Sequence, residues 1–395
     1  MTELEHYDTI IVGGRVAGSS LAINLSRAGQ KVVVLDRAEF PSDTLSSHVI
    51  YPNTLKRLDD LGVMDRVLEN GPPPLYTAWH FDGRMVTAPH TPIDGRDYAM
   101  CVRRITLDSI LVDKAKEEGV EFLEGHQVTG ILGGATEADP VKGVTASGPS
   151  GDFSINADLV VGADGANSST ARLVGAKKHS TMPNDTMQYY AYWKNVGVRN
   201  TQEFFFEPPD VITHFPSDNG HHLIGITVPK SDRKSITSLE DYYLDKVMGV
   251  PELANRLSQA ERVSQVRGTN RLEGYYRTST GPGWALTGDA AHFKHPATAQ
   301  GISDALHASE ALAPMICKGN YREKFPEWRH EQSREFYAFS KHLAETPSVE
   351  AMDNMFNALV RDPHLARRLF DVWSKVSSPW KDVIPYIPGS EQVMG

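Results

Sequence analysis

The stretch DTIIVGGRVAGSSLA, residues 8–22, contains the turn that decides the fold of this chain. Apolar β-forming residues run directly into Gly13 and Gly14, and a helix-forming stretch begins beside Gly18. This order of strand, glycines and helix is that of the dinucleotide-binding turn G-x-G-x-x-G. The middle position is Arg15, where a glycine normally lets the backbone approach a pyrophosphate. Because arginine readily adopts negative φ values, we expect the turn to survive and the guanidinium to add charge-assisted bonds to the phosphates.

The segments that follow complete a βαβ unit. Residues 17–29 have the apolar spacing of a helix that ends at Gly29, and residues 31–36 form a nearly all-apolar strand. Asp36 ends this strand about 20 residues after the glycines, where a carboxylate accepts hydrogen bonds from the ribose hydroxyls of an adenosine. A carboxylate would repel a 2′-phosphate, so Asp36 favours FAD or NAD over NADP at this site.

The remaining patterns divide the chain into alternating blocks. Helices and buried strands typical of a nucleotide-binding domain occupy residues 1–75, 101–176 and 276–320. Strand-like patterns predict a sheet built from residues 76–100 and 177–275, and residues 321–395 are helical. The sequence therefore predicts an α/β fold in which a Rossmann-like FAD-binding domain is interrupted by an antiparallel β-sheet substrate domain, with a helical C-terminal tail.

Composition excludes several classes of function. The 395 residues favour two domains, or one domain with a large insertion. The formal charge of −10 and the lack of a dense Lys/Arg block argue against a nucleic-acid partner. No apolar run is long enough to span a bilayer and the polar first residues form no signal peptide, so we expect a cytoplasmic protein with no membrane partner. Cys101 and Cys317 lack metal-ligand spacing, so we expect no metal site.

Two later turns combine with the first to identify the dinucleotide. The stretch ADLVVGADG ends a buried strand at Asp164, and GWALTGDAAHF ends another at Gly288 and Asp289. A carboxylate at the end of a buried strand is poorly placed unless it meets ligand hydroxyls or backbone donors. Gly301 then begins a helix whose N-terminus can face the negative edge of a flavin.

Together these motifs resemble the FAD-dependent aromatic hydroxylases (group A flavoprotein monooxygenases), which have the para-hydroxybenzoate hydroxylase fold. The similarity covers roughly residues 5–315 and runs through the glycine turn with Asp36, the Asp164 motif, and the Asp289 motif with Pro296. The stretches GGRVAG, FPSDT, YYAYW and QGISDA are similar to those of one branch of this superfamily, and Arg15 belongs to the first of them. The resemblance is specific for FAD and leaves the substrate open.

The resemblance also implies roles for individual residues. Asp36 would hold the adenosine ribose, Arg104 the pyrophosphate and ribityl region, and Asp289 the ribityl chain. Pro296 and Gly301 would lie along the isoalloxazine ring. The full set of residues expected to bind FAD is Gly13, Gly14, Arg15, Ala17, Gly18, Asp36, Arg37, Arg104, Val128, Asp164, Gly288, Asp289, Pro296, Gly301 and Ile302.

Residues near the reacting centre are expected in three places. His48 lies in a segment that relatives place beside the flavin ring, and Pro296 would lie along that ring. These two are the expected catalytic residues. The alternative for His48 is that it packs under its loop. Alternation along YYAYW places Tyr190 and Tyr192 on one face of a strand. The residues expected to line the substrate pocket are Tyr190, Tyr192, His214 and Phe215.

The activity implied by the resemblance is that of an FAD-dependent monooxygenase. Such an enzyme uses NAD(P)H and O2 to hydroxylate an electron-rich, aromatic small molecule through a flavin C4a-hydroperoxide. No second complete glycine fingerprint is present, so NAD(P)H binds transiently or a separate flavin reductase supplies electrons. The alternatives are a flavin-dependent double-bond reductase of the geranylgeranyl reductase type and a non-catalytic flavin-fold binding protein. The W-x-W-x-I-P motif of flavin halogenases is absent. We expect a monomer or a homodimer.

The tail carries two amphipathic stretches, residues 325–346 and the sequence VEAMDNMFNALVRD. Their polar faces mix both signs of charge, which disfavours attachment to a membrane. Relatives place a helical tail across the junction of the two domains. We therefore expect the apolar faces to dock on the body and to cap the substrate pocket.

Overall fold

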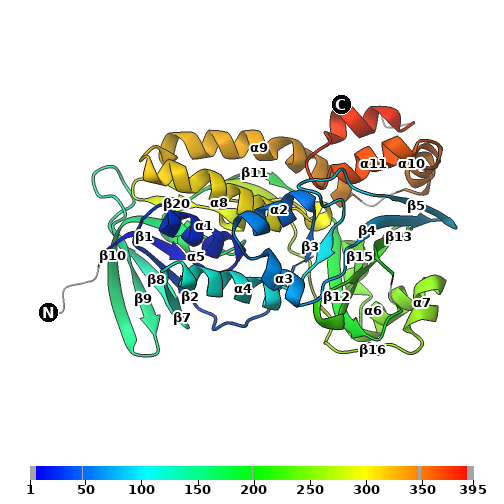
Figure 1. Ribbon diagram of the computed structural model, residues 1–395, viewed down its shortest axis with the longest axis horizontal. Coiled ribbons are helices and arrows are strands. Elements are labelled where there is room, and N and C mark those ends of the chain that lie inside the picture. The colour runs from blue at the N-terminus through cyan, green and yellow to red at the C-terminus, as the bar shows by residue number, and fades with distance from the viewer. Residues whose placement is uncertain (1–5, 47, 198, 346–347, 389–395) are drawn as a thin grey trace.

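The computed structural model describes residues 6–46, 48–197, 199–345 and 348–388 (Figure 1). Some positions of the predicted blocks lie outside the described residues, namely 1–5, 47, 198, 346–347 and 389–395. Figure 1 shows two halves side by side, one with a parallel sheet under long helices and one with a second sheet. The predicted α/β class is confirmed.

The first sheet has the order β19-β20-β10-β1-β2-β7, and its central strands are parallel. All five residues of β2 are buried, as an apolar strand covered on both faces should be. Two antiparallel strands, β8 and β9, extend the sheet from β10. The strands are β1 (His6–Val12), β2 (Val32–Asp36), β7 (Glu121–Glu124), β8 (Gln127–Leu132), β9 (Gly143–Gly148), β10 (Gly151–Gly162), β19 (Thr280–Gly281) and β20 (Trp284–Leu286).

Helices on both faces of this sheet bury two apolar clusters against it. The helix α1 follows β1 directly and packs between α4 and α8, and α9 lies along α8 (Figure 1). The helices of this half are α1 (Val16–Arg27), α2 (Pro52–Asp60), α3 (Met64–Glu69), α4 (Arg104–Glu117), α5 (Ser169–Leu173), α8 (Gly301–Cys317) and α9 (Tyr321–Ala344).

The second sheet has the order β16-β12-β15-β14-β13-β4-β5, with β17 beside β12. It is antiparallel except where β13 runs parallel to β4. One face packs on α6 (Leu239–Met248) and α7 (Pro251–Leu257). The strands are β4 (Tyr76–Phe81), β5 (Arg84–Ala88), β12 (Thr186–Lys194), β13 (Thr201–Glu207), β14 (Asp210–Pro216), β15 (His222–Pro229), β16 (Glu261–Arg262) and β17 (Arg267–Thr269).

Short strands and the tail join the two halves. The tail helices α10 (Val349–Arg361) and α11 (Pro363–Asp371) cover the other face of the second sheet and share one buried cluster with it (Figure 1). The short strands are β3 (Val49–Ile50), β6 (Met100–Cys101), β11 (Lys178–Met182), β18 (Gly274–Arg277) and β21 (His292–Phe293). Within the described ranges, no helix combines the length and apolar character needed to cross a membrane.

Candidate active site

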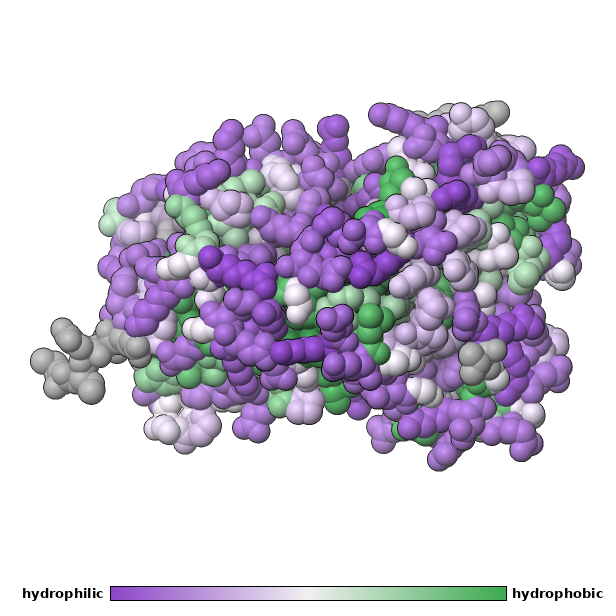
Figure 2. Space-filling view, in the orientation of Figure 1, coloured by the Kyte–Doolittle hydropathy of each residue, from purple (hydrophilic) through white to green (hydrophobic). Residues whose placement is uncertain are grey.

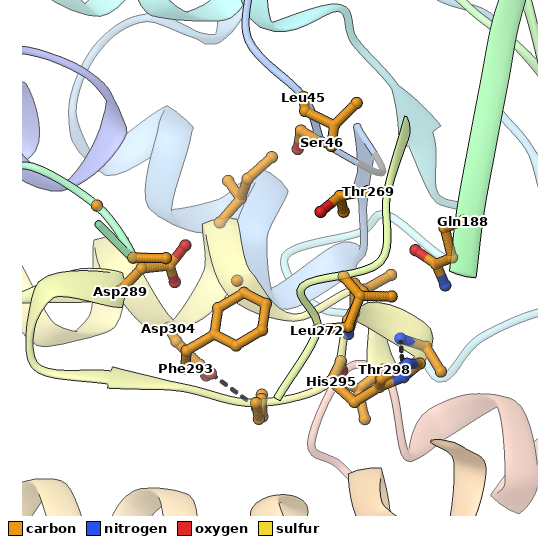
Figure 3. A pocket seen from close by; sticks show the side chains of 18 of the residues that line it. Leu45, Ser46, Gln188, Thr269, Leu272, Asp289, Phe293, His295, Thr298 and Asp304 are labelled. Carbon is orange, nitrogen blue, oxygen red and sulfur yellow. Dashed lines mark hydrogen bonds and ion pairs between the residues drawn. The ribbon is translucent and has the colours of Figure 1, made fainter. Parts of the chain in front are cut away.

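A cavity of about 1280 Å³ lies where the two sheets and the tail meet. Its walls come from the carboxyl ends of β1, β2 and β10, from residues 42–46, from one face of the second sheet, and from the tail. Figure 3 shows Leu45, Gln188 and Thr269 around the same space as Asp289 and Thr298. The outer face in Figure 2 is largely hydrophilic, and hydrophobic side chains gather near its middle, between the two halves.

The glycine turn forms one end of the cavity. Gly13 has a φ of +102°, and a Cβ there would lie 2.6 Å from the carbonyl oxygen of Ala163, so only glycine fits. A Cβ on Gly18 would lie 1.8 Å from the Gly13 carbonyl oxygen, which explains the close approach of α1 to the turn. Gly13 lines the cavity, whereas Gly14 and Gly18 act behind its wall through packing.

Arg15 occupies an extended backbone position, with φ −83° and ψ −163°, which any residue can adopt. Its side chain lines the cavity, but its guanidinium is engaged by protein groups. It donates to the carboxylate of Asp108 at 2.6 Å, to the Ser42 carbonyl at 2.9 Å and to the Asp43 carbonyl at 3.2 Å. The arginine therefore ties the glycine turn to Ser42 and Asp43, and contact with a pyrophosphate stays a prediction.

Replacing Arg15 with glycine should leave FAD bound, because glycine restores the common turn and the extended backbone is open to it. The loss should appear in residues 38–46, whose amide hydrogens we expect to exchange at least tenfold faster without the guanidinium bonds. Hydrogen exchange with mass spectrometry measures this directly. Complete loss of FAD from a folded Arg15→Gly protein would contradict this account of the turn.

Asp36 and Arg104 lie on the same wall as the turn. The Asp36 carboxylate accepts from the amides of Gly14, at 2.6 Å, and Ala38, at 2.8 Å. Arg104 donates from Nε and Nη2 to the buried carboxylate of Asp108, at 2.9 and 3.0 Å. Asp108 thus aligns two arginines, a role that was not predicted from the sequence. A carboxylate at i+4 from Arg104, on the helix face of the buried Leu107 and Leu111, was the available signal.

Two other carboxylates expected to meet FAD differ in their surroundings. Asp164 accepts from the Thr170 amide at 3.0 Å and from the Ser169 hydroxyl at 2.9 Å, so the first turn of α5 already occupies it. The side chain of Asp289 accepts no hydrogen bond from the described residues. Burial raises the pKa of Asp289 to about 6, against the opposing effect of Arg104. Asp289 is therefore the carboxylate most in need of a ligand hydroxyl. The remaining expected FAD residues on the wall are Ala17, Arg37, Val128, Gly288, Pro296, Gly301 and Ile302.

Residues 294–304, here called the flavin loop, form the next part of the wall and include the first turn of α8. His295 orders the loop, because its Nδ1 accepts the Ala297 amide at 3.2 Å and its Nε2 lies 3.1 Å from the Thr186 hydroxyl. An imidazole that accepts at Nδ1 carries its proton on Nε2 and is neutral. Burial accordingly lowers the pKa of His295 to about 4.

Acid should destabilise the protein through this and other buried histidines. The pKa of His48 is lowered to about 3 and those of His90 and His295 to about 4, chiefly by burial. The unfolded chain takes up these protons below pH ~6.5 while the folded chain does not, so stability is full above that pH and is lost below it. From pH 7 to 5 we expect a loss of about 2 kcal/mol for each such histidine.

Urea midpoints at pH 7, 6 and 5 measure this loss. The raised pKa of Asp289 acts in the opposite direction, since its folded carboxyl keeps a proton to higher pH. In His295→Gln the dependence of the urea midpoint on pH should be shallower. A midpoint that does not move between pH 7 and 5 would contradict the prediction.

The second sheet and the tail form an aromatic chamber at the other end of the cavity. Tyr190 and Phe215 line it, as expected from the sequence, together with Trp79, Phe204 and Leu223 on the same face of the sheet. Paired register explains this, since Trp79 lies opposite Phe204 and Phe215 opposite Leu223. The tail supplies the opposite wall through Phe339, Leu343, Met352, Met355, Leu369 and Trp373.

Tyr192 and His48 lie behind the chamber wall and do not line the cavity. The Tyr192 hydroxyl contacts Nε2 of His48, whose side chain is fully buried. Burial and the nearby Arg104 lower the pKa of His48 to about 3, so the ring is neutral. The expectation that His48 would lie beside the reacting centre is corrected: it packs under its loop and reaches the chamber only through neighbours.

The expectation that His214 lines the pocket is also corrected. Side chains alternate along β14, so Phe215 faces the chamber and His214 faces α7. There its Nδ1 lies 2.9 Å from the Glu203 carboxylate, which also accepts from Arg256 at 2.6 Å. His214 therefore belongs to a buried charge network that attaches α7 to the sheet. No cluster of ligating side chains suited to a metal ion occurs in the part of the chain that the structure describes.

Comparison with known proteins places this fold. The model of the FAD binding domain family matches residues 6–324. A digeranylgeranylglycerophospholipid reductase of Methanococcus vannielii is 24% identical over 90% of each chain. The 6-methylpretetramide 4-monooxygenase of Streptomyces rimosus is 25% identical over 82% of this chain and 78% of its own. The solved structure of a flavin-dependent brominase has a TM-score of 0.77 at 19% identity, over 99% of this chain and 98% of its own.

The fold and the cavity therefore define the class of protein, an FAD-dependent oxidoreductase. The chain belongs to the FAD binding domain family, whose model covers most of its length, and FAD is its cofactor. The resemblance to FAD-dependent hydroxylases noted in the sequence is confirmed at the level of family and fold. The residues around the turn, Asp289 and the flavin loop fit such a group, since they combine backbone donors, an unpartnered carboxylate and an apolar wall.

Proposed function

We propose that this protein is a monooxygenase that hydroxylates an electron-rich, aromatic small molecule with O2. The observation that carries the proposal is the continuity of the cavity, which runs from the glycine turn past the flavin loop into a chamber walled by aromatic side chains. FAD, when bound, supplies the redox chemistry with O2, and NAD(P)H or a separate flavin reductase supplies the electrons. The chain's own task is to orient the substrate and exclude water.

Named residues have distinct tasks in this proposal. Asp36, Arg104 and Asp289 hold the cofactor, and Pro296 forms the flavin-loop wall at the chamber. Tyr190 and Phe215 contact the substrate, and burial keeps the Tyr190 phenol neutral by raising its pKa to about 12. His48 is a positioning residue, since it acts through the Tyr192 hydroxyl that it contacts.

A flavin-dependent double-bond reductase is the second candidate. The match to the digeranylgeranylglycerophospholipid reductase covers 90% of both chains. The chamber's Met352, Met355 and Leu369 would suit an isoprenoid chain as well as a ring system. A non-catalytic binding protein is the third, and the intact Asp289, Pro296 and Gly301 speak against it.

The discriminating experiment is anaerobic reduction of the purified protein by NADH and by NADPH, followed by rapid mixing with O2. The flavin of a monooxygenase should be reduced by one of them, or by an added flavin reductase. Mixing with O2 should then reoxidise it within seconds, through a transient absorption band that belongs to neither the reduced nor the oxidised flavin. Reduced protein that ignores O2 but reduces an isoprenoid double bond would support the reductase. Protein whose flavin accepts electrons from none of these donors would support the binding protein.

A further inference from the structure

A buried group of charges joins the C-terminal tail to the flavin loop. The Asp304 carboxylate lies 2.7 Å from Nζ of Lys294, in the loop, and 2.6 Å from Nζ of Lys375, which follows α11. Both ammonium groups also lie over the Phe336 ring of α9, at 5.6 and 5.2 Å from its centroid. The flavin loop, α9 and the segment after α11, which are distant in the sequence, therefore meet at these two ammonium groups.

Gln300 makes a second connection beside the first. Its side-chain amide donates to the carbonyls of Val372, at 3.1 Å, and Trp373, at 3.3 Å, and its oxygen accepts from Lys294 at 2.6 Å. Only 1% of Gln300 is exposed. A buried amide with these partners fixes the distance between the loop and the turn formed by residues 372–375.

The backbone on both sides of this junction is strained. Ala299 has a φ of +47° and Lys375 a φ of +56°, both in the left-handed region that side chains disfavour. Such conformations persist where surrounding contacts over-determine them. Here the contacts are those of Gln300, which directly follows Ala299, of Asp304 in the first turn of α8, and of the Lys375 side chain itself.

A buried ion pair contributes little net stability compared with well-packed apolar side chains, but it can specify one arrangement. The arrangement specified here includes a wall of the cavity, since Pro296, Ala299, Gly301 and Ile302 all line it. The carbonyls and the ammonium that hold this wall come from the tail. The tail therefore acts on the cofactor side of the cavity as well as on the substrate chamber.

We propose that residues 372–375 position the flavin loop, with Gln300 and Lys375 as positioning residues that set the shape of the wall assigned to the flavin ring. The inference rests on FAD as the cofactor and is independent of the reaction proposed above. It predicts that a change in the tail alters the bound flavin without any direct contact to it.

The test compares Lys375→Met with Lys381→Met in the full-length, FAD-loaded protein. Lys381 is the matched control, because it is an exposed lysine of the same tail. In Lys375→Met, Asp304 keeps Lys294 as a partner, so the chain should still fold. We expect its FAD dissociation constant to rise about tenfold, a coupling of the size carried between packed segments. Its visible flavin absorption bands should shift. The Lys375→Arg protein keeps the positive charge, so its FAD dissociation constant and flavin spectrum should stay close to those of the wild type. The Lys381→Met protein should match the wild type.

Gln300→Met gives a second measurement if Lys375→Met does not fold, because it removes the bonds to the tail without removing a charge. It should change the flavin spectrum in the same direction. Wild-type FAD affinity and spectrum in both variants, or in Gln300→Met alone where only that variant folds, would overturn the proposal. So would a loss in Lys375→Met that Lys375→Arg does not restore. The wild-type flavin could be neither reduced by these donors nor reoxidised by O2 while the flavin spectrum of the variants still differs from that of the wild type. In that case the proposed reaction fails and this inference stands.

Discussion

Replacing Asp36 with alanine is expected to weaken FAD binding about a hundredfold, or ~3 kcal/mol. Asp36 is 8% exposed, and its carboxylate accepts hydrogen bonds from the amides of Gly14 and Ala38 at 2.6 and 2.8 Å. It therefore shapes the turn as well as offering an acceptor to the ribose. Hydrogen bonds to a charged group contribute more than neutral ones, so losing both tasks together costs more than losing one ribose contact.

Fluorescence titration of the apoprotein with FAD measures the effect. Asp158→Ala is the matched control, since Asp158 belongs to β10 of the same sheet and its side chain is 73% exposed. The control should bind FAD as the wild type does. An Asp36→Ala protein that folds and binds FAD within threefold of the wild-type dissociation constant would show that Asp36 does not hold the cofactor.

A chain that ends at Lys318 is expected not to fold. The deleted segment contains Phe325, Phe356 and Phe370, which are fully buried, and Phe339, which is 3% exposed. Removing one such ring from a core costs about 3–5 kcal/mol, and the whole stability of a domain is about 5–15 kcal/mol. Removing the tail also deprives Trp79 of Phe370 and Trp373, whose ring centroids lie 5.6 and 5.7 Å from its own.

Far-ultraviolet circular dichroism and gel filtration would detect the unfolded or aggregated product. A chain that ends at Glu345 is the graded control, because it keeps α9 on α8 and removes the helices over the second sheet together with residues 372–375. We expect this longer chain to retain more helix and to expose the chamber. A monomeric, cooperatively unfolding protein that ends at Lys318 would show that the tail is not part of the core.

Local rules made much of the FAD half predictable. The turn at Gly13, the position of Asp36 and the amphipathic helix after Arg104 depend on neighbours within a few residues, so their patterns survive in the sequence. The alternation of side chains also predicted the two faces of β12, since Tyr190 and Tyr192 pack on one face and Ala191 and Trp193 on the other. The amphipathic tail was predicted to dock by its apolar face, and Phe336 and Phe339 are buried.

By itself the sequence determined the family and the cofactor, because these depend on short stretches whose backbone geometry is local. Only the tertiary structure decided which side chains meet. Arg15 is held by Asp108, which lies 93 residues away along the chain. His214 faces α7 because the opposite face of β14, with Phe215, lines the chamber. The junction of Gln300 with residues 372–373 likewise joins segments 72 and 73 residues apart. Such contacts leave no periodic pattern, since packing between distant segments creates them.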